Sequence, residues 1–167
     1  AAIREETRRA AMGSPSRRAD HLAAAARLAD LAGDHVQRKE LLEKAVALAP
    51  GHPVVLHNLG NTRQDQGDFA SAADHFRGAL VANPRLAASA LNAGVAHSRL
   101  GDRKAARRYF RRAVAIDSQS FAGWMNLAVT ELSLGDRDAA RRAAEKAREL
   151  RPRARAVQDL LRRIGSS

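Results

Sequence analysis

One spacing dominates this sequence: a Gly-Asp pair recurs every 34 residues, beginning at Gly33, Gly67, Gly101 and Gly135. Each glycine is followed by an alanine after 12 residues and, after 17 residues, by proline in three copies and serine in one. The positions concerned are Ala45, Ala79, Ala113 and Ala147, then Pro50, Pro84, Ser118 and Pro152. Several markers that keep one register over four copies predict a repeat array, in which each unit packs mainly against its neighbours.

Each repeat is predicted to hold two helices joined at the Gly-Asp pair. Glycine suits the left-handed cap that ends the first helix, and aspartate suits the N-cap of the second. Proline ends the second helix because it has no N–H to continue the hydrogen-bond ladder. The predicted fold class is therefore all-α, built of antiparallel helix pairs.

The predicted repeats cover residues 19–52, 53–86, 87–120 and 121–154, and the first of them is degenerate. Residues 1–18 are predicted to form a helix and a turn, for which a partial repeat is one interpretation. Residues 155–167 are predicted to form an amphipathic capping helix and a tail, since apolar residues recur there at helical spacing. Such a helix covers the last apolar surface of an array.

The second and fourth repeats resemble the tetratricopeptide repeat family. In the second, the resemblance lies in Leu59-Gly60, Gly67-Asp68-Phe69, Ala72, Phe76, Ala79 and Pro84. In the fourth, it lies in Trp124, Leu127, Gly135-Asp136, Ala140, Ala147 and Pro152. The resemblance implies a right-handed superhelical solenoid whose concave face is lined by the first helices and binds peptides or protein segments. It also implies that Phe76 and Trp124 lie in the core.

The sequence departs from this family at the eleventh place of each repeat, where an aromatic residue is usual. Ala29, Arg63, His97 and Glu131 stand there instead. Stacking of the repeats would bring the last three into one line, so we predict a partly exposed row of residues that pair ionically.

An asparagine occupies one place of the first helix in three successive repeats, at Asn58, Asn92 and Asn126. At 100° per residue this place lies opposite the core side. Because an amide both donates and accepts, such a ladder could hold the backbone of an extended peptide. The arrays of O-linked N-acetylglucosamine transferases and kinesin light chains, which this pattern resembles, use a similar ladder. The alternative is that asparagine here reflects common ancestry of the repeats.

Other residues are assigned to the same predicted peptide-binding face. They are Asn61, Val95, Val129, Arg99, His57 and Arg27. Arg27 and Arg99 are candidate anchors for an acidic group. The carboxylate clamp of chaperone-binding members of the family is not expected, because Ala23, Ala88 and Asn92 stand where three of its basic groups would be.

The net charge of +11 is uneven, since residues 101–167 carry 16 basic and 8 acidic groups. The sequence places a basic patch on the outer face of the second helices. It consists of Arg107, Arg108, Arg111, Arg112, Arg141 and Arg142. Such a patch can attract an anionic partner, or it can simply be a solvated helix surface. Specific nucleic-acid binding is not expected, because no aromatic reading element accompanies the cations.

Catalysis finds no support in the sequence. The chain has no cysteine, its six histidines show no metal-ligand spacing, and no phosphate-cradling glycine loop is present. We therefore expect no enzyme activity, no cofactor and no metal. With no apolar run long enough to cross a bilayer, we expect no membrane insertion and a cytoplasmic location.

The function predicted from sequence is a protein-interaction scaffold that binds an extended peptide or protein segment in the concave groove. Two alternatives remain open. One is a non-catalytic repeat region of a larger modular enzyme, which positions a substrate or mediates oligomerisation, including homo-oligomerisation. The other is an electrostatic adaptor that acts through the basic patch on an anionic partner.

Overall fold

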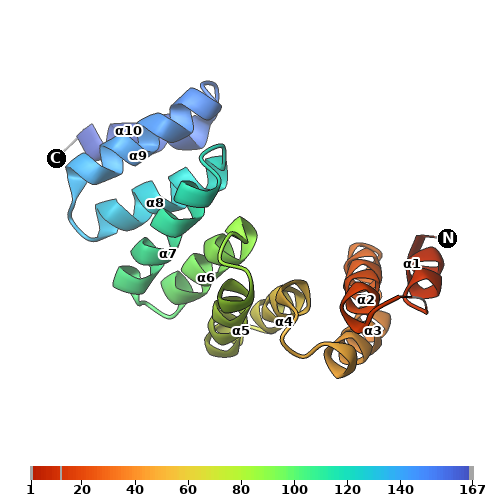
Figure 1. The fold of residues 1–167 in the computed structure, drawn as a ribbon. Helices are drawn as coiled ribbons and strands as arrows, with labels where there is room; N and C mark the ends of the chain where they lie inside the picture. Colours follow the sequence, from red (N-terminus) through yellow and green to blue (C-terminus); the bar gives the residue numbers. More distant parts are fainter. Residues whose placement is uncertain (1, 12, 166–167) are drawn as a thin grey trace. The chain divides into compact units, whose positions relative to one another are not determined.

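The computed structural model describes residues 2–11 and 13–165, which form ten α-helices and no strand (Figure 1). The helices are α1 (Ala2–Arg9), α2 (Pro15–Leu31), α3 (His35–Leu48), α4 (Pro53–Asp65), α5 (Phe69–Ala82), α6 (Ala87–Arg99), α7 (Arg103–Ile116), α8 (Phe121–Ser133), α9 (Arg137–Leu150) and α10 (Arg155–Gly165). Residues 1, 12, 166 and 167, which the predicted end segments include, lie outside the described residues.

The chain divides into two compact units, Ala1–Pro84 and Arg85–Ser167. Unit 1 contains α1 to α5, and unit 2 contains α6 to α10. Within the units, α2 packs with α3, α4 with α5, α6 with α7 and α8 with α9. The predicted all-α fold of antiparallel helix pairs is therefore confirmed. The first pair begins at Pro15, four residues before the predicted boundary at 19, and the repeat boundaries themselves stay predictions.

The turns between paired helices have the predicted chemistry. The four glycines of the Gly-Asp pairs have φ between +74° and +83°, in the left-handed region that favours glycine. Each aspartate caps the following helix: Asp102 Oδ1, for example, accepts from the backbone N–H of Ala105 at 2.9 Å. Such a cap stabilises a helix by about 1 kcal/mol. The Gly-Asp pair thus ends one helix and starts the next within three residues.

The core is thin because small residues bring the helices close together. The buried residues of α9, for example, are alanines only. In α4 the backbone at Gly60 lies against the ring of Phe76, which is fully buried as predicted. In α6 the backbone at Gly94 lies against Phe110 in the same way. Each ring fills the space that a side chain at the glycine would otherwise occupy.

Polar contacts tie the helices of unit 1 together beside this thin core. The Arg38 guanidinium on α3 pairs with Asp30 on α2 and, at 2.9 Å, with Asp65 at the end of α4. Asn58 Nδ2 on α4 donates to the carbonyl oxygen of Ala23 on α2 at 3.1 Å. Three successive helices are thereby linked by side chains as well as by apolar packing.

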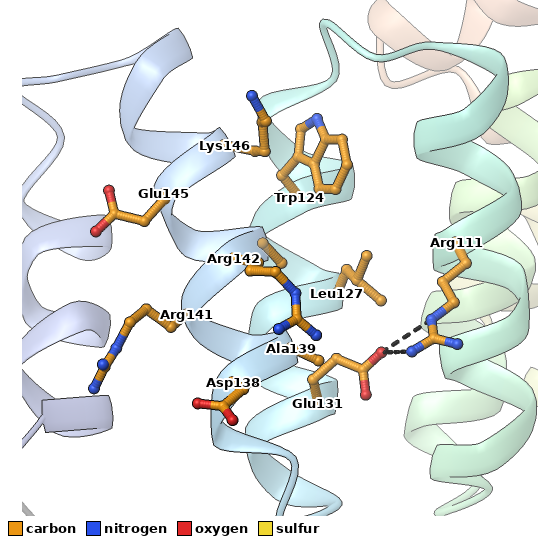
Figure 2. A pocket seen from close by; sticks show the side chains of 11 residues that line it. Arg111, Trp124, Leu127, Glu131, Asp138, Ala139, Arg141, Arg142, Glu145 and Lys146 are labelled. Carbon is orange, nitrogen blue, oxygen red and sulfur yellow. Dashed lines mark hydrogen bonds and ion pairs between the residues drawn. The ribbon is translucent and has the colours of Figure 1, made fainter.

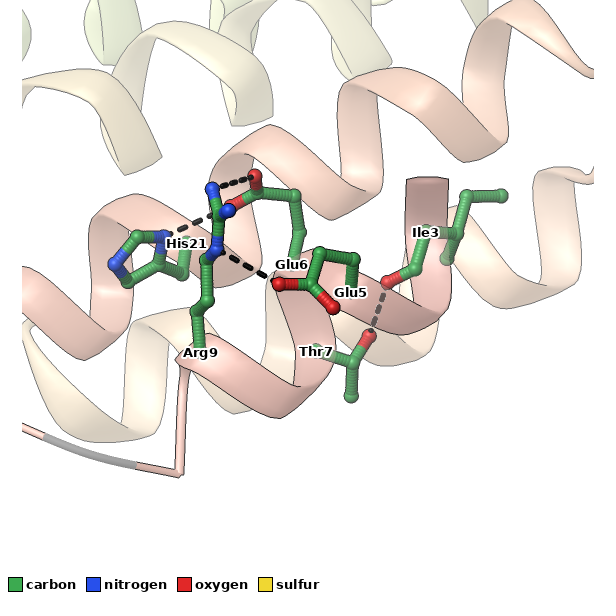
Figure 3. A network of polar contacts seen from close by, with 6 residues as sticks. All are labelled: Ile3, Glu5, Glu6, Thr7, Arg9 and His21. Atoms are coloured by element: carbon green, nitrogen blue, oxygen red, sulfur yellow. Dashed lines mark hydrogen bonds and ion pairs between the residues drawn. The ribbon is translucent and has the colours of Figure 1, made fainter. Parts of the chain in front are cut away.

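Polar groups help to join helix α1 to α2, beside the apolar contact of Ile3 with the core of unit 1 (Figure 3). His21 Nδ1 lies 2.8 Å from Glu6 Oε2, and Arg9 pairs with both Glu5 and Glu6. Arg18 Nε donates to the carbonyl oxygen of Ala10 at 2.9 Å. These contacts hold the short helix, which has no buried residue of its own, against unit 1.

At the other end, α10 lays an apolar stripe on unit 2. Val157, Leu160 and Ile164 are buried in the same core cluster as the alanines of α9. Arg137 Nη1 also donates to the carbonyl oxygen of Ile164 at 2.8 Å. The helix therefore covers apolar surface that α8 and α9 would expose.

The contact between Gly60 and Phe76 predicts opposite effects for one substitution at two helical glycines. A Cβ at Gly60 would lie 2.5 Å from Phe76 Cε1, whereas one at Gly78 meets only Leu56 Cδ1, at 3.3 Å. Overpacking by Gly60→Ala costs about 1–3 kcal/mol and outweighs the helix-propensity gain of about 1 kcal/mol. We expect Gly60→Ala to lower the free energy of unfolding and Gly78→Ala to leave it unchanged or raise it, measured by urea denaturation. Equal responses would contradict this packing.

The hydrogen bond from Asn58 predicts a structural effect at that asparagine. Asn58→Ala removes the link between α4 and α2, and we expect the free energy of unfolding to fall by about 1 kcal/mol. Asn126→Ala, at the same place of another repeat, is the matched control, since no side-chain hydrogen bond joins Asn126 to another helix in the described part of the chain. Denaturation curves of the two variants that shift equally would contradict the assignment.

Candidate functional site

The structure brings three predicted site residues of unit 1 together at a small cavity. Arg27 of α2 and Asn58 and Asn61 of α4 line it, beside Arg38. Its volume of about 30 Å³ holds one or two water molecules and no peptide. The side chain of Asn58, which was predicted to bind a peptide, donates to the backbone of Ala23 on the neighbouring helix.

His57 is held within unit 1 rather than presented as a free cation. Its ring packs on Phe76 with centroids 5.6 Å apart, and Asn61 Nδ2 lies 3.3 Å from its Nε2. Burial lowers the pKa of His57 below its usual value, so the ring is neutral at pH 7 and Nε2 can accept from the amide. His57 is therefore a packed, uncharged group and is not part of the cavity lining.

In unit 2 the predicted residues share the exposed side of two helices that contact each other. Asn92, Val95 and Arg99 lie on α6, and Asn126 and Val129 lie on α8. Both asparagines are half-buried, Arg99 is exposed and 48% of the surface of Val129 is exposed. Val95 also packs against the core of the unit. We call these five residues the first-helix face.

The predicted ionic row at the eleventh place is wrong for Glu131. Its side chain is only 1% exposed, and its Oε1 accepts from Arg111 Nη2 at 2.6 Å and from Nε at 3.0 Å (Figure 2). His97 instead stacks on Tyr109, with ring centroids 5.2 Å apart. The position of a residue along one helix gives the side on which it lies, but not that an arginine of α7 reaches across to it.

The predicted basic patch is therefore partly neutralised. Arg111 pairs with Glu131, and Arg107 Nη1 lies 3.7 Å from Glu131 Oε2. Arg108, Arg141 and Arg142 are exposed and form no ion pair in the part of the chain that the structure describes. The last predicted member, Arg112, is half-buried on α7.

A hollow that the sequence did not predict lies beside these arginines. Its volume is about 650 Å³, and residues of α7, α8 and α9 line it. Trp124, predicted to be core, lies in its lining and is only half-buried, with Nε1 donating to the carbonyl oxygen of Ser118 at 2.9 Å. The signal for the hollow was the missing aromatic residue at the eleventh place.

Two classes of site find no candidate in residues 2–11 and 13–165. No three histidine, aspartate or glutamate side chains there converge in a way that could hold a metal ion. No helix in the same residues is long and apolar enough to cross a membrane.

Comparisons with solved structures find the same fold in proteins of different assembly. Over 97% of this chain and 32% of the matched chain, the APC/C hetero-tetramer Cut9–Hcn1 is similar with a TM-score of 0.82 and 21% identity. The first TPR of Spaghetti (RPAP3), bound to the HSP90 peptide SRMEEVD, is similar with a TM-score of 0.65 and 24% identity. The match covers 68% of this chain and 90% of the Spaghetti chain. MamA is similar with a TM-score of 0.76 and 21% identity, over 83% of this chain and 81% of the MamA chain. The chain thus spans about a third of the matched chain of Cut9–Hcn1.

Comparison of the sequence with family models also identifies the repeats. Among curated proteins no match is found. Two family models of the tetratricopeptide repeat match residues 53–119 and 98–164, and together they extend over α4 to α10. With the Gly-Asp turns, the antiparallel helix pairs and these matches in agreement, the chain belongs to the tetratricopeptide repeat family.

Proposed function

We propose that this chain is a protein-interaction scaffold without catalytic activity, and that its first-helix face binds an extended polypeptide segment. The observation that carries the proposal is the placement of Asn92 and Asn126. They occupy one place of two successive repeats, on helices that contact each other. Amide side chains in this arrangement can contact a peptide backbone at successive points along it.

The spacing of the two helices fits an extended ligand. Packed helices lie about 8–10 Å apart, and an extended chain advances roughly 3.3 Å per residue. Asn92 and Asn126 would therefore meet the ligand backbone at about every third residue. Binding through the backbone makes the site tolerant of the ligand's sequence.

The side chains around the asparagines add apolar and charged contacts. Val129 is exposed on α8, and Val95 stands at the corresponding place of α6. An apolar strip beside polar groups favours a covering partner over bulk water. Arg99 at the end of α6 can pair with a carboxylate of the ligand.

Unit 1 contributes less to this proposed site. The cavity that Asn58 lines with Arg27 and Asn61 has a volume of about 30 Å³, which is room for water but not for a peptide. We therefore assign the principal contacts to unit 2, with His57, Asn58, Asn61 and Arg27 as further members of the proposed surface.

The similar Spaghetti (RPAP3) domain, whose structure contains an HSP90 peptide, supports peptide binding as a use of this fold. The ligand of this chain is proposed to be different. Ala88 and Asn92 stand on α6 where the clamp for a terminal carboxylate would place basic groups.

A double variant tests the proposed function. A peptide library displayed on phage is selected on the whole chain, and the affinities of the enriched peptides are measured by calorimetry. Asn92→Ala/Asn126→Ala removes both amides, and two hydrogen bonds of about 1 kcal/mol each predict roughly 30-fold weaker binding. The circular dichroism spectrum of the double variant should match that of the wild type, which would show that binding is lost without loss of helix.

Gln119→Ala is the control, since its side chain is exposed in the turn between α7 and α8. It should bind the same peptides as tightly as the wild type. If the double variant also retains full affinity for every enriched peptide, the first-helix face is not the binding site.

A further inference from the structure

We propose a second binding site, the outer hollow, which takes an acidic peptide with one large apolar side chain. The outer hollow is the 650 Å³ space lined by α7, α8 and α9 of unit 2 (Figure 2). The residues used in the argument are Arg111, Trp124, Glu131, Ala139, Arg141 and Arg142. The site is separate from the first-helix face and does not depend on it.

The outer hollow exists because its lining has small or slender side chains, one of them at a place where this family usually has a large ring. Glu131 occupies the place at which this family usually has an aromatic ring, and it turns toward Arg111 (Figure 2). The small side chains of Ala139 and Ala143 on α9 leave space unfilled. Trp124 and Leu127 of α8 form the apolar part of the lining, which we call the floor. A space of 650 Å³ is within the range of ligand pockets and has room for a large side chain.

A buried acceptor in the lining points independently to a ligand. The side chain of Glu131 is 1% exposed, and its Oε2 accepts no hydrogen bond among the described residues. Arg107 is 3.7 Å away, too far for a hydrogen bond. Leaving a buried carboxylate oxygen unsatisfied costs free energy. A backbone or side-chain N–H of a ligand in the outer hollow would satisfy it.

The rim of the outer hollow favours an acidic ligand. Arg141 and Arg142 line it and have no ion pair in the described ranges, and the same holds for Arg108 nearby on α7. Two of the three carboxylates of the lining are already paired, Glu131 with Arg111 and Glu145 with Arg148.

Asp138 also lines the outer hollow. It lies in the first turn of α9, where the positive end of the helix dipole stabilises its negative charge. Arg111 pairs with Glu131 and Lys146 with Glu149, so two cations of the lining, Arg141 and Arg142, stand without an ion pair in the described ranges against one such carboxylate, Asp138. A peptide with carboxylates on either side of an apolar residue matches this pattern: the apolar group meets the floor and the carboxylates meet the arginines.

Trp124 provides a direct test, because it is the only tryptophan of the chain and lies in the lining. A phage-displayed library of tryptophan-free peptides is selected on the whole chain and counter-selected on the Arg141→Glu/Arg142→Glu variant. The enriched peptides are synthesised and titrated while the emission of Trp124 is recorded. We expect acidic sequences with a Phe, Tyr or Leu, a saturable change in emission and binding that weakens as salt is raised.

Three variants locate the bound peptide. Arg141→Glu/Arg142→Glu should weaken binding at least about tenfold, whereas Arg153→Glu, an exposed arginine of unit 2 outside the lining, should weaken it less than about twofold. Glu131→Tyr fills the outer hollow with the ring usual in the family and should abolish binding, measured by calorimetry.

Failure of the selection to enrich acidic peptides would overturn the proposal. So would peptides that leave the emission of Trp124 unchanged, or that bind the Glu131→Tyr variant as tightly as the wild type. If circular dichroism shows that Glu131→Tyr does not fold, Ala139→Leu narrows the same space from α9 and is judged by the same criterion.

Discussion

The close approach of neighbouring helices is the constraint on which the rest of this structure depends. Gly60 lies against Phe76 and Gly94 against Phe110, and alanines are most of the buried hydrophobic residues in the described part of the chain. Helices separated by such small residues bury little apolar area for each residue, and hydrophobic stabilisation scales with that area. Specific polar contacts therefore take a larger part in holding helix to helix, as Arg38 and Asn58 do in unit 1.

The features predicted correctly from the sequence are those fixed within a few residues. A left-handed glycine followed by a capping aspartate needs only local backbone geometry, so the turn at Gly101 and Asp102 could be placed in advance. The pairing of helices followed, because a short turn brings two consecutive amphipathic helices side by side. The burial of Phe76 followed from its place in the repeat.

The predictions that failed depended on which side chain reaches across from another helix. Helical periodicity places Glu131 on a side of α8, but only the structure shows that Arg111 of α7 covers it and that it is buried. The hydrogen bond from Asn58 of α4 to Ala23 of α2 is another contact between helices that the sequence does not indicate. A long or flexible side chain can turn along its helix surface, so its partner depends on interhelical distances that no single-helix pattern contains.

The repeat register relates the hollows of the two units to each other, while single side chains decide their chemistry. Leu59 and Arg63 of α4 line a second hollow, of about 370 Å³, in unit 1, and they occupy the same places as Leu127 and Glu131 of α8. Glu43 lines it at the place of Arg111, so the acidic and basic positions are exchanged between the two units. The usual aromatic ring is absent at both places, and among the described residues that line the two hollows, Glu131 of unit 2 is the fully buried carboxylate. Equivalent places of the repeat thus carry hollows whose linings differ in the position of their charges.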